Sequence, residues 1–141
     1  MSYLDTSALL SLFLPDAHTD LMRRWLDEEP PEIATSAFAL AELGAVLGNR
    51  VRNREMTALE AKRLLDALDH WIAAEAVLLP IEDADHLPAA NFVRAFTLAL
   101  RAPDALHVAL CRRVGAALLT FDARQAEAAR RLGVECDPAG V

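Results

Sequence analysis

Two short apolar runs, far apart in the chain, each stop at an aspartate. The first run, residues 2–4, precedes Asp5, and the second, residues 117–121, precedes Asp122. Apolar runs of this length are typical of short buried strands. In an open parallel sheet, ligands bind in the crevice outside the carboxyl ends of the strands. The sequence therefore predicts that the two carboxylates face one crevice at the same edge of a sheet.

Between and after these runs, strand and helix patterns alternate. Further strands are predicted over residues 32–35, 76–81 and 134–136. Helices are predicted over residues 8–14, 16–29, 36–47, 57–72, 83–100, 105–114 and 126–132. The alternation predicts an α/β fold: one domain over residues 1–141, with a mostly parallel sheet of about four to five short strands and helices on both faces.

Several of the predicted helices carry terminal signals. Thr57 and Glu60 have the spacing of a capping box, and Gly115 suits the left-handed residue that often follows a helix. Pro103 stands near the first position of the helix that follows it, which puts Asp104 in the first turn. Because the remainder of that helix is apolar nearly all round, we expect it to be central.

Composition is that of an ordered globular protein: 54% of the 141 residues are hydrophobic. The net charge of −7 is not that of a protein that coats nucleic acid. Thirteen of the 14 basic residues are nevertheless arginine, and Arg50, Arg52 and Arg54 form one cluster. Guanidinium groups suit phosphate. The alternative is that such clusters are solvated helix faces that complement helix dipoles.

The chain carries no sign of an oxidising compartment or a membrane. Cys111 and Cys136 lie far apart in apolar runs, so we expect two free thiols. The first apolar stretch, residues 8–14, is too short to span a bilayer and follows an acid instead of a basic segment. We therefore expect a cytoplasmic protein with no membrane contact.

Four of the 21 acidic residues lie within or beside apolar segments: Asp5, Glu42, Asp104 and Asp122. Buried carboxylates are rare unless they are paired or bound to a metal. In one interpretation, Asp5 and Asp104 cap helices and Glu42 pairs with an arginine. In the other, the four carboxylates belong to one functional site. Spacing alone leaves both open.

The segments around these acids resemble four motifs of the PIN-domain family, and within it the small toxin ribonucleases of the VapC type. The segments are YLDTSAL at residues 3–9, AEL at 41–43, RAPDALH at 101–107 and LTFD at 119–122. Each string alone is a weak signal, but all four occur in order and at domain-sized spacing. The resemblance covers nearly the whole chain.

The resemblance implies a metal-dependent endoribonuclease in which Asp5, Glu42, Asp104 and Asp122 surround one or two Mg²⁺ or Mn²⁺ ions. Hard divalent cations prefer oxygen ligands, and clustered carboxylates would repel RNA unless a cation neutralised them. Because Mg²⁺ retains several waters, we expect Asp5 and Asp104 to contact it directly and the other two to act through water.

Supporting roles follow from the same resemblance. Ser7 and Thr120 occupy motif positions from which a hydroxyl would bind a carboxylate or a metal-bound water; a turn or cap contact is the alternative. The clustering of Arg50, Arg52 and Arg54 downstream of Glu42, rather than the resemblance, makes them a candidate track for RNA phosphates.

The resemblance also implies two partners, a cognate antitoxin and a second copy of the chain in a homodimer. Apolar residues near the N-terminus would line a groove for an amphipathic helix, although such residues are more often core: Leu12, Phe13, Leu14 and Trp25. His107 stands three residues after Asp104, a position that invites a catalytic role, but because its helix is apolar it is predicted to pack in the core. The other histidines lack zinc-site spacing. The alternative function is a catalytically silent PIN-fold module that binds RNA or a protein.

Overall fold

The computed structural model describes residues 1–28 and 32–137. Within these ranges, five short strands form one sheet in the order β3-β2-β1-β4-β5, and every neighbouring pair is parallel. The strands are β1 (Ser2–Leu4), β2 (Ile33–Thr35), β3 (Ala76–Leu78), β4 (Ala117–Leu119) and β5 (Cys136–Asp137). The predicted parallel α/β fold is confirmed. Because β1 and β4 are adjacent, Asp5 and Asp122 follow neighbouring strands.

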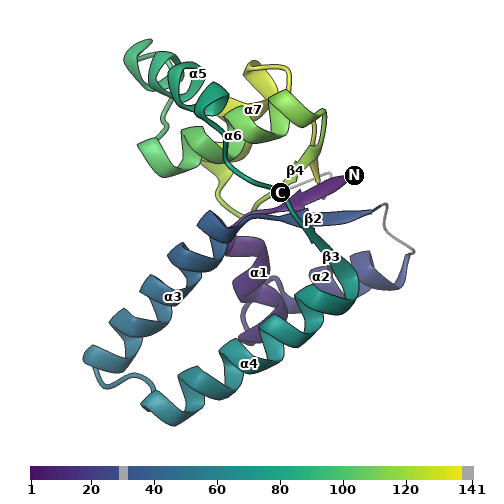
Figure 1. Ribbon diagram of the computed structural model, residues 1–141, viewed down its shortest axis with the longest axis vertical. Helices are drawn as coiled ribbons and strands as arrows, with labels where there is room; N and C mark the ends of the chain where they lie inside the picture. Colours follow the sequence, from purple (N-terminus) through teal and green to yellow (C-terminus); the bar gives the residue numbers. More distant parts are fainter. Residues whose placement is uncertain (29–31, 138–141) are drawn as a thin grey trace.

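Helices cover both faces of this sheet (Figure 1). On one face lie α1 (Thr6–Phe13), α2 (Thr19–Asp27), α3 (Ala37–Arg52) and α4 (Ala58–Glu75). On the other face lie α5 (Asp83–Arg94), α6 (Ala102–Val114) and α7 (Ala123–Arg131). Among the described helices, none is long and apolar enough to cross a membrane.

The central strand β1 separates two hydrophobic cores. Tyr3 packs into the cluster formed with α5, α6 and α7, whereas Leu4 packs into the cluster formed with α1, α3 and α4. Both side chains are fully buried. Alternate residues of a strand point to opposite faces, so three residues are enough to supply both cores. The short strand therefore fixes where Asp5, the next residue, emerges.

The predicted terminal signals are present. Thr57 Oγ1 accepts the backbone N–H of Glu60, and Glu60 accepts that of Thr57, which completes the capping box of α4. Gly115 follows α6 with φ of 69°, the left-handed conformation that glycine adopts without a Cβ penalty. As expected, α6 is largely buried, with its core-facing residues running from Ala105 to Cys111.

Two predicted helix boundaries are wrong. The helix expected from residue 16 begins at Thr19, because Asp16 accepts the N–H of His18 and the Ser11 hydroxyl in a turn; Glu29, its expected end, lies outside the described residues. The helix expected to include Phe96 and Leu100 ends at Arg94. Phe96 has φ of 59°, which no α-helix accommodates.

The strands are also shorter than expected. The strands expected over residues 76–81 and 117–121 stop at Leu78 and Leu119, and the strand expected over 134–136 begins at Cys136. Pairing, rather than hydrophobicity, sets these lengths: β4 ends where its partner β1 ends, with Leu119 opposite Leu4. Residues beyond that pair turn into the site.

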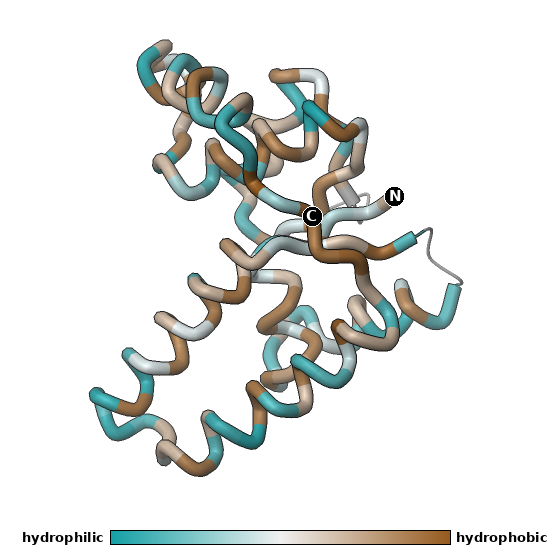
Figure 2. The backbone as a smooth tube through the Cα atoms, in the orientation of Figure 1, coloured by the Kyte–Doolittle hydropathy of each residue, from teal (hydrophilic) through white to brown (hydrophobic). Residues whose placement is uncertain are grey.

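Apolar positions recur along α3 and α4, and the faces that these positions form meet α1 (Figure 2). Leu43, Leu47 and Leu68 are buried there. The apolar residues considered for a groove (Leu12, Phe13, Leu14 and Trp25) are half-buried against the same cluster. Their main contacts are therefore core contacts. Both cysteines are free, as expected.

Candidate active site

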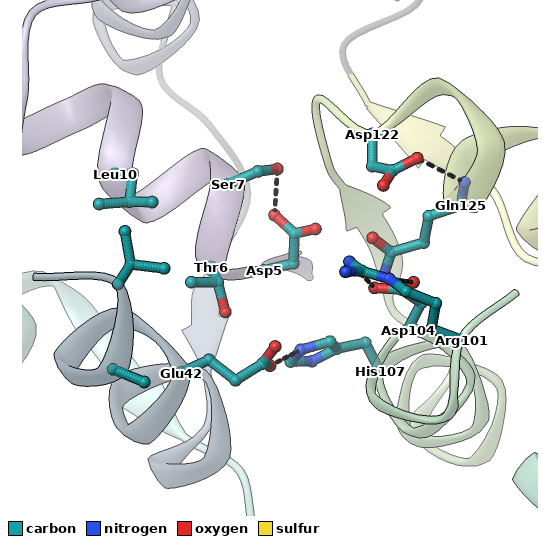
Figure 3. A pocket seen from close by; sticks show the side chains of 12 residues that line it. Asp5, Thr6, Ser7, Leu10, Glu42, Arg101, Asp104, His107, Asp122 and Gln125 are labelled. Carbon is teal, nitrogen blue, oxygen red and sulfur yellow. Dashed lines mark hydrogen bonds and ion pairs between the residues drawn. The ribbon is translucent and has the colours of Figure 1, made fainter. Parts of the chain in front are cut away.

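A pocket lies at the carboxyl ends of β1 and β4, bounded by α1, α3, α6 and α7 (Figure 3). Its volume is about 390 Å³. All four carboxylates singled out in the sequence line it. The lining residues are Asp5, Thr6, Ser7, Leu10, Glu42, Ala45, Val46, Arg101, Asp104, His107, Asp122 and Gln125. The predicted crevice at one edge of the sheet is therefore present, with acids from four separate segments.

Asp5 is both a helix cap and a pocket residue. Its Oδ1 accepts the backbone N–H of Ala8 at 3.0 Å and the Ser7 hydroxyl at 2.7 Å, so it caps α1. Only 4% of the residue is exposed. Burial raises the pKa of the Asp5 carboxyl above its usual value, although hydrogen bonds from Thr120, Ala8 and Ser7 oppose the rise. A nearby cation would favour the ionised form.

Ser7 and Thr120 connect the two strand ends. Besides donating to Asp5, Ser7 Oγ accepts the backbone N–H of Phe121 at 2.9 Å. Thr120 Oγ1 lies 3.4 Å from Ser7 Oγ and accepts the N–H of Asp122 at 3.1 Å. Both hydroxyls therefore make turn contacts, and Ser7 also donates a hydrogen bond to the Asp5 carboxylate.

Asp122 begins α7 in the way that Asp5 begins α1. Its Oδ1 accepts the N–H groups of Arg124 and Gln125 at 2.9 and 3.1 Å. The buried side chain of Gln125 accepts the Thr120 hydroxyl through Oε1, while its Nε2 has no hydrogen-bond partner among the described residues. One oxygen of Asp122 is thus committed to the cap, and the pocket also holds an unsatisfied donor.

Glu42 is held by a chain of hydrogen bonds that reaches across the sheet. Its Oε1 lies 2.5 Å from Nε2 of His107, whose Nδ1 lies 2.7 Å from the hydroxyl of Tyr3. That hydroxyl lies 2.7 Å from Ser36 Oγ, which caps α3. Because a carboxylate only accepts, Nε2 of His107 carries a proton. His107 is buried as predicted, but it also positions Glu42, which the sequence did not indicate.

Asp104 is paired with an arginine of its own helix terminus. Arg101 Nε and Nη2 donate to the two Asp104 oxygens at 3.0 and 3.4 Å. The Asp104 side chain is 11% exposed, whereas that of Arg101 is 76% exposed. The arginine pairing considered for Glu42 therefore occurs at Asp104 instead. The sequence feature that could have predicted this pair is the spacing of three residues between Arg101 and Asp104 at the start of a helix.

Arg50, Arg52 and Arg54 do not line this pocket. They lie at and just beyond the far end of α3, eight or more residues after Glu42, and all three are exposed. At about 1.5 Å per residue, this is roughly 12 Å along the helix. His18, His70 and His86 are likewise outside the pocket lining.

The donor set suits a hard cation, although its members are not gathered around one point. Within the described ranges, no three His, Cys, Asp or Glu side chains converge closely enough to hold a metal ion by themselves. Four carboxylates nevertheless line one pocket. Mg²⁺ commonly takes one or two protein carboxylates and keeps its waters. The residues therefore fit a hydrated divalent ion better than an all-protein metal cage.

Comparisons with known proteins agree with the motifs and the fold. The PIN-domain family model matches residues 2–131. The chain belongs to the PIN-domain family. It is 31% identical over 138 residues to Ribonuclease VapC46 of Mycobacterium tuberculosis, a match that covers 94% of this chain and 92% of that protein. The resemblance seen in the four motifs is therefore confirmed.

Solved structures share the architecture at low sequence identity. VapC20 of Mycobacterium tuberculosis, described as a toxin that cleaves the sarcin-ricin loop, has a TM-score of 0.73 and 20% identity; the match covers 91% of this chain and 95% of that one. The toxin-antitoxin complex from Klebsiella pneumoniae has a TM-score of 0.59 and 19% identity, with coverage of 86% and 87%. At these identities the likeness establishes the fold.

Proposed function

We propose that the chain is a metal-dependent endoribonuclease and the toxin of a toxin-antitoxin pair. The main support is the convergence of Asp5, Glu42, Asp104 and Asp122 on one pocket at the carboxyl edge of the sheet. The related VapC46, named a ribonuclease, supports the choice of RNA as substrate. RNA and an antitoxin would both be met in the cytoplasm, the compartment expected from the sequence.

In this proposal, Asp5 and Asp104 would hold Mg²⁺ or Mn²⁺ directly, and Glu42 and Asp122 would act through water. The bound cation would lower the pKa of a water, polarise the scissile phosphate and stabilise the leaving oxygen. Ser7 and Thr120 fix the Asp5 carboxylate, with Ser7 donating at 2.7 Å. Preorganised groups of this kind act without reorganising during the reaction.

His107 determines how Glu42 faces the pocket. The imidazole is fixed between Glu42 and Tyr3 and is only 2% exposed, so it holds one carboxylate oxygen and leaves the other available. A carboxylate oriented in this way can accept a proton from water that attacks the phosphate. Asp122, anchored through Oδ1 to the start of α7, likewise presents its second oxygen.

Three further parts of the proposal concern binding. Arg50, Arg52 and Arg54 would guide RNA that extends beyond the pocket along α3. The cognate antitoxin follows from the family resemblance, with the Klebsiella toxin-antitoxin complex as a structural parallel. A homodimer remains a prediction that light scattering would test; Leu87 and the edge-strand residues Val77 and Leu78 are exposed apolar side chains available for it.

Cleavage of a mixed RNA pool tests the proposal directly. The purified chain is assayed with Mg²⁺, Mn²⁺ or chelator, beside Asp5→Asn, Asp104→Asn and the control Asp20→Asn, whose side chain is 86% exposed. We expect cleavage to require metal and to fall at least about 100-fold in the first two variants, the order seen when one electrostatic contact is removed. The control should cleave normally.

The alternative, a catalytically silent module, predicts a different result. Folded protein, free of antitoxin, would then bind RNA or a protein partner but cut nothing with either metal. Circular dichroism and thermal melts of each variant separate loss of the site from loss of the fold. Cleavage that persists in chelator, or in both asparagine variants, would contradict the metal-dependent mechanism.

A further inference from the structure

Arg101 lines the carboxylate pocket, unlike Arg50, Arg52 and Arg54. Its guanidinium binds Asp104 through Nε and Nη2, and Asp122 and Glu42 also act on it electrostatically, after Asp104, to raise its pKa. Three of the four pocket acids therefore act electrostatically on this one cation, and Asp104 also binds it directly. A substrate phosphate that entered the pocket would meet these acids and Arg101 together.

The Arg101–Asp104 pair is exchangeable. The Arg101 side chain is 76% exposed, so water and salt compete for it and weaken its contact with Asp104, whose own side chain is 11% exposed. Asp104, by contrast, is held in the first turn of the buried helix α6. If Asp104 changes partner, the arginine is therefore the group that moves. Its long side chain and exposed position at the helix start permit that movement.

A cation and Arg101 compete for the same atoms. Arg101 engages both oxygens of Asp104, at 3.0 and 3.4 Å. Those oxygens are also the ones that Asp104 offers to a divalent ion, and two positive groups on one carboxylate repel each other. Once displaced, a guanidinium keeps its charge and its planar set of donors, which match a phosphate oxygen pair.

We propose that Arg101 is a phosphate-binding residue of the pocket: it occupies Asp104 in the metal-free protein and, when a divalent cation takes Asp104, turns to the phosphodiester of the bound RNA. This inference rests on the proposed function and adds a residue to it. It also separates two groups of arginines, because Arg50, Arg52 and Arg54 lie outside the pocket and cannot compete with a cation there.

Metal binding without RNA is the first test. Isothermal titration with Mn²⁺ compares wild type with Arg101→Gln and Arg101→Lys. Arg23→Gln is a matched control, because Arg23 also sits in an exposed pair with an aspartate three residues away. We expect Arg101→Gln to bind Mn²⁺ about three- to fivefold more tightly, the range that an exposed ion pair allows. The Mn²⁺ affinity of Arg101→Lys should fall between those of wild type and Arg101→Gln, and the affinity of the control should match that of wild type.

RNA binding is the second test. Anisotropy of a fluorescein-labelled 12-nucleotide oligouridylate is followed against salt, with and without Ca²⁺, an oxygen-preferring cation. A gel confirms that the RNA stays intact. In Ca²⁺, Arg101→Gln should weaken binding several-fold and reduce the salt slope by about 0.7, the loss of one phosphate contact on a single strand. The triple alanine variant of Arg50, Arg52 and Arg54 should reduce the slope regardless of Ca²⁺ and leave Mn²⁺ affinity unchanged.

Contrary outcomes separate this inference from the proposed function. If Mn²⁺ binds Arg101→Gln equally or more weakly than wild type, Arg101 is a structural clamp for Asp104 and the exchange is wrong. If the salt dependence of RNA binding is unchanged in Arg101→Gln, the proposed phosphate contact is wrong. In either case, metal-dependent cleavage by wild type would leave the nuclease proposal standing. A wild type that binds no Mn²⁺ would overturn both.

Discussion

The two ends of helix α6 each hold an arginine–aspartate pair, and the pairs differ in burial. At the start of the helix, Arg101 binds Asp104 at the pocket mouth, with side chains 76% and 11% exposed. Near the end, Arg113 binds Asp85 of α5 at 2.7 and 3.0 Å, with side chains 26% and 1% exposed. Arg113 also donates to the carbonyl of Pro80.

This difference shows how one kind of contact serves two purposes. Asp85 additionally accepts the N–H of Glu82, so each of its oxygens is satisfied within the fold. Removing one partner of such a pair leaves a buried charge, which is costly. Arg101 is itself 76% exposed, so its removal should cost less than that of Arg113, because water can reach the position it leaves. The buried pair therefore joins α5 to α6, while the exposed pair is free to respond to ligands.

The largest expected effect is on stability at the buried end. Asp85→Ala should lower the free energy of unfolding by about 3 kcal/mol, since it leaves Arg113 unpaired and removes a capping contact of α5. Asp104→Ala should change it by less than about 1 kcal/mol. Urea denaturation of the metal-free variants measures both. Equal losses would show that the two pairs are structurally equivalent.

The second prediction concerns pH, because the pKa values of Asp85 and Asp5 are shifted in opposite directions. Burial would raise the pKa of Asp85, but hydrogen bonds from Arg113 and Glu82 outweigh it and lower the pKa. Burial raises the pKa of Asp5. A lowered pKa contributes stability that is present above the unfolded value and lost as pH falls through the folded value; a raised pKa makes the folded state lose stability as pH rises above the unfolded value.

Thermal melts of the metal-free protein across pH test these signs. Above the ordinary aspartate range of about 4, Asp5→Asn should melt a few degrees higher than wild type, and the difference should grow until Asp5 is ionised. Asp85→Asn should melt lower at neutral pH and approach wild type in acid. If Asp5→Asn melts lower at neutral pH, the carboxylate of Asp5 is stabilising and the assigned direction is wrong.

The smallest expected effect is the response of the exposed pair to salt. At low ionic strength, Arg101→Ala should cost less than about 0.5 kcal/mol, and the cost should disappear near 0.5 M NaCl because exposed pairs are screened. Arg113→Ala should keep most of its larger cost, since Asp85 is buried. Denaturation at two salt concentrations measures both. A salt-resistant cost at Arg101 would contradict its ready exchange.

Local patterns explain why much of the fold was predictable. The capping box at Thr57 and the left-handed Gly115 depend only on neighbouring residues, and both are present. The meeting of Asp5 and Asp122 also followed from the sequence, because parallel strands end at one edge; Glu42 and Asp104 were added through the family motifs. The misplaced boundaries, such as the end of α5 before Phe96, arose where backbone conformation and strand pairing override hydrophobic pattern.

Short-range periodicity and strand polarity were enough to predict the alternation of strands and helices and the position of Asp5 and Asp122 at the carboxyl edge of the sheet, whereas Glu42 and Asp104 were added through the family motifs. How Glu42 is held depends on the tertiary structure alone. His107 and Glu42 are 65 positions apart, and Tyr3 and His107 are 104 apart. Such partners meet only because helices from opposite faces pack on one strand, and no local pattern encodes that meeting.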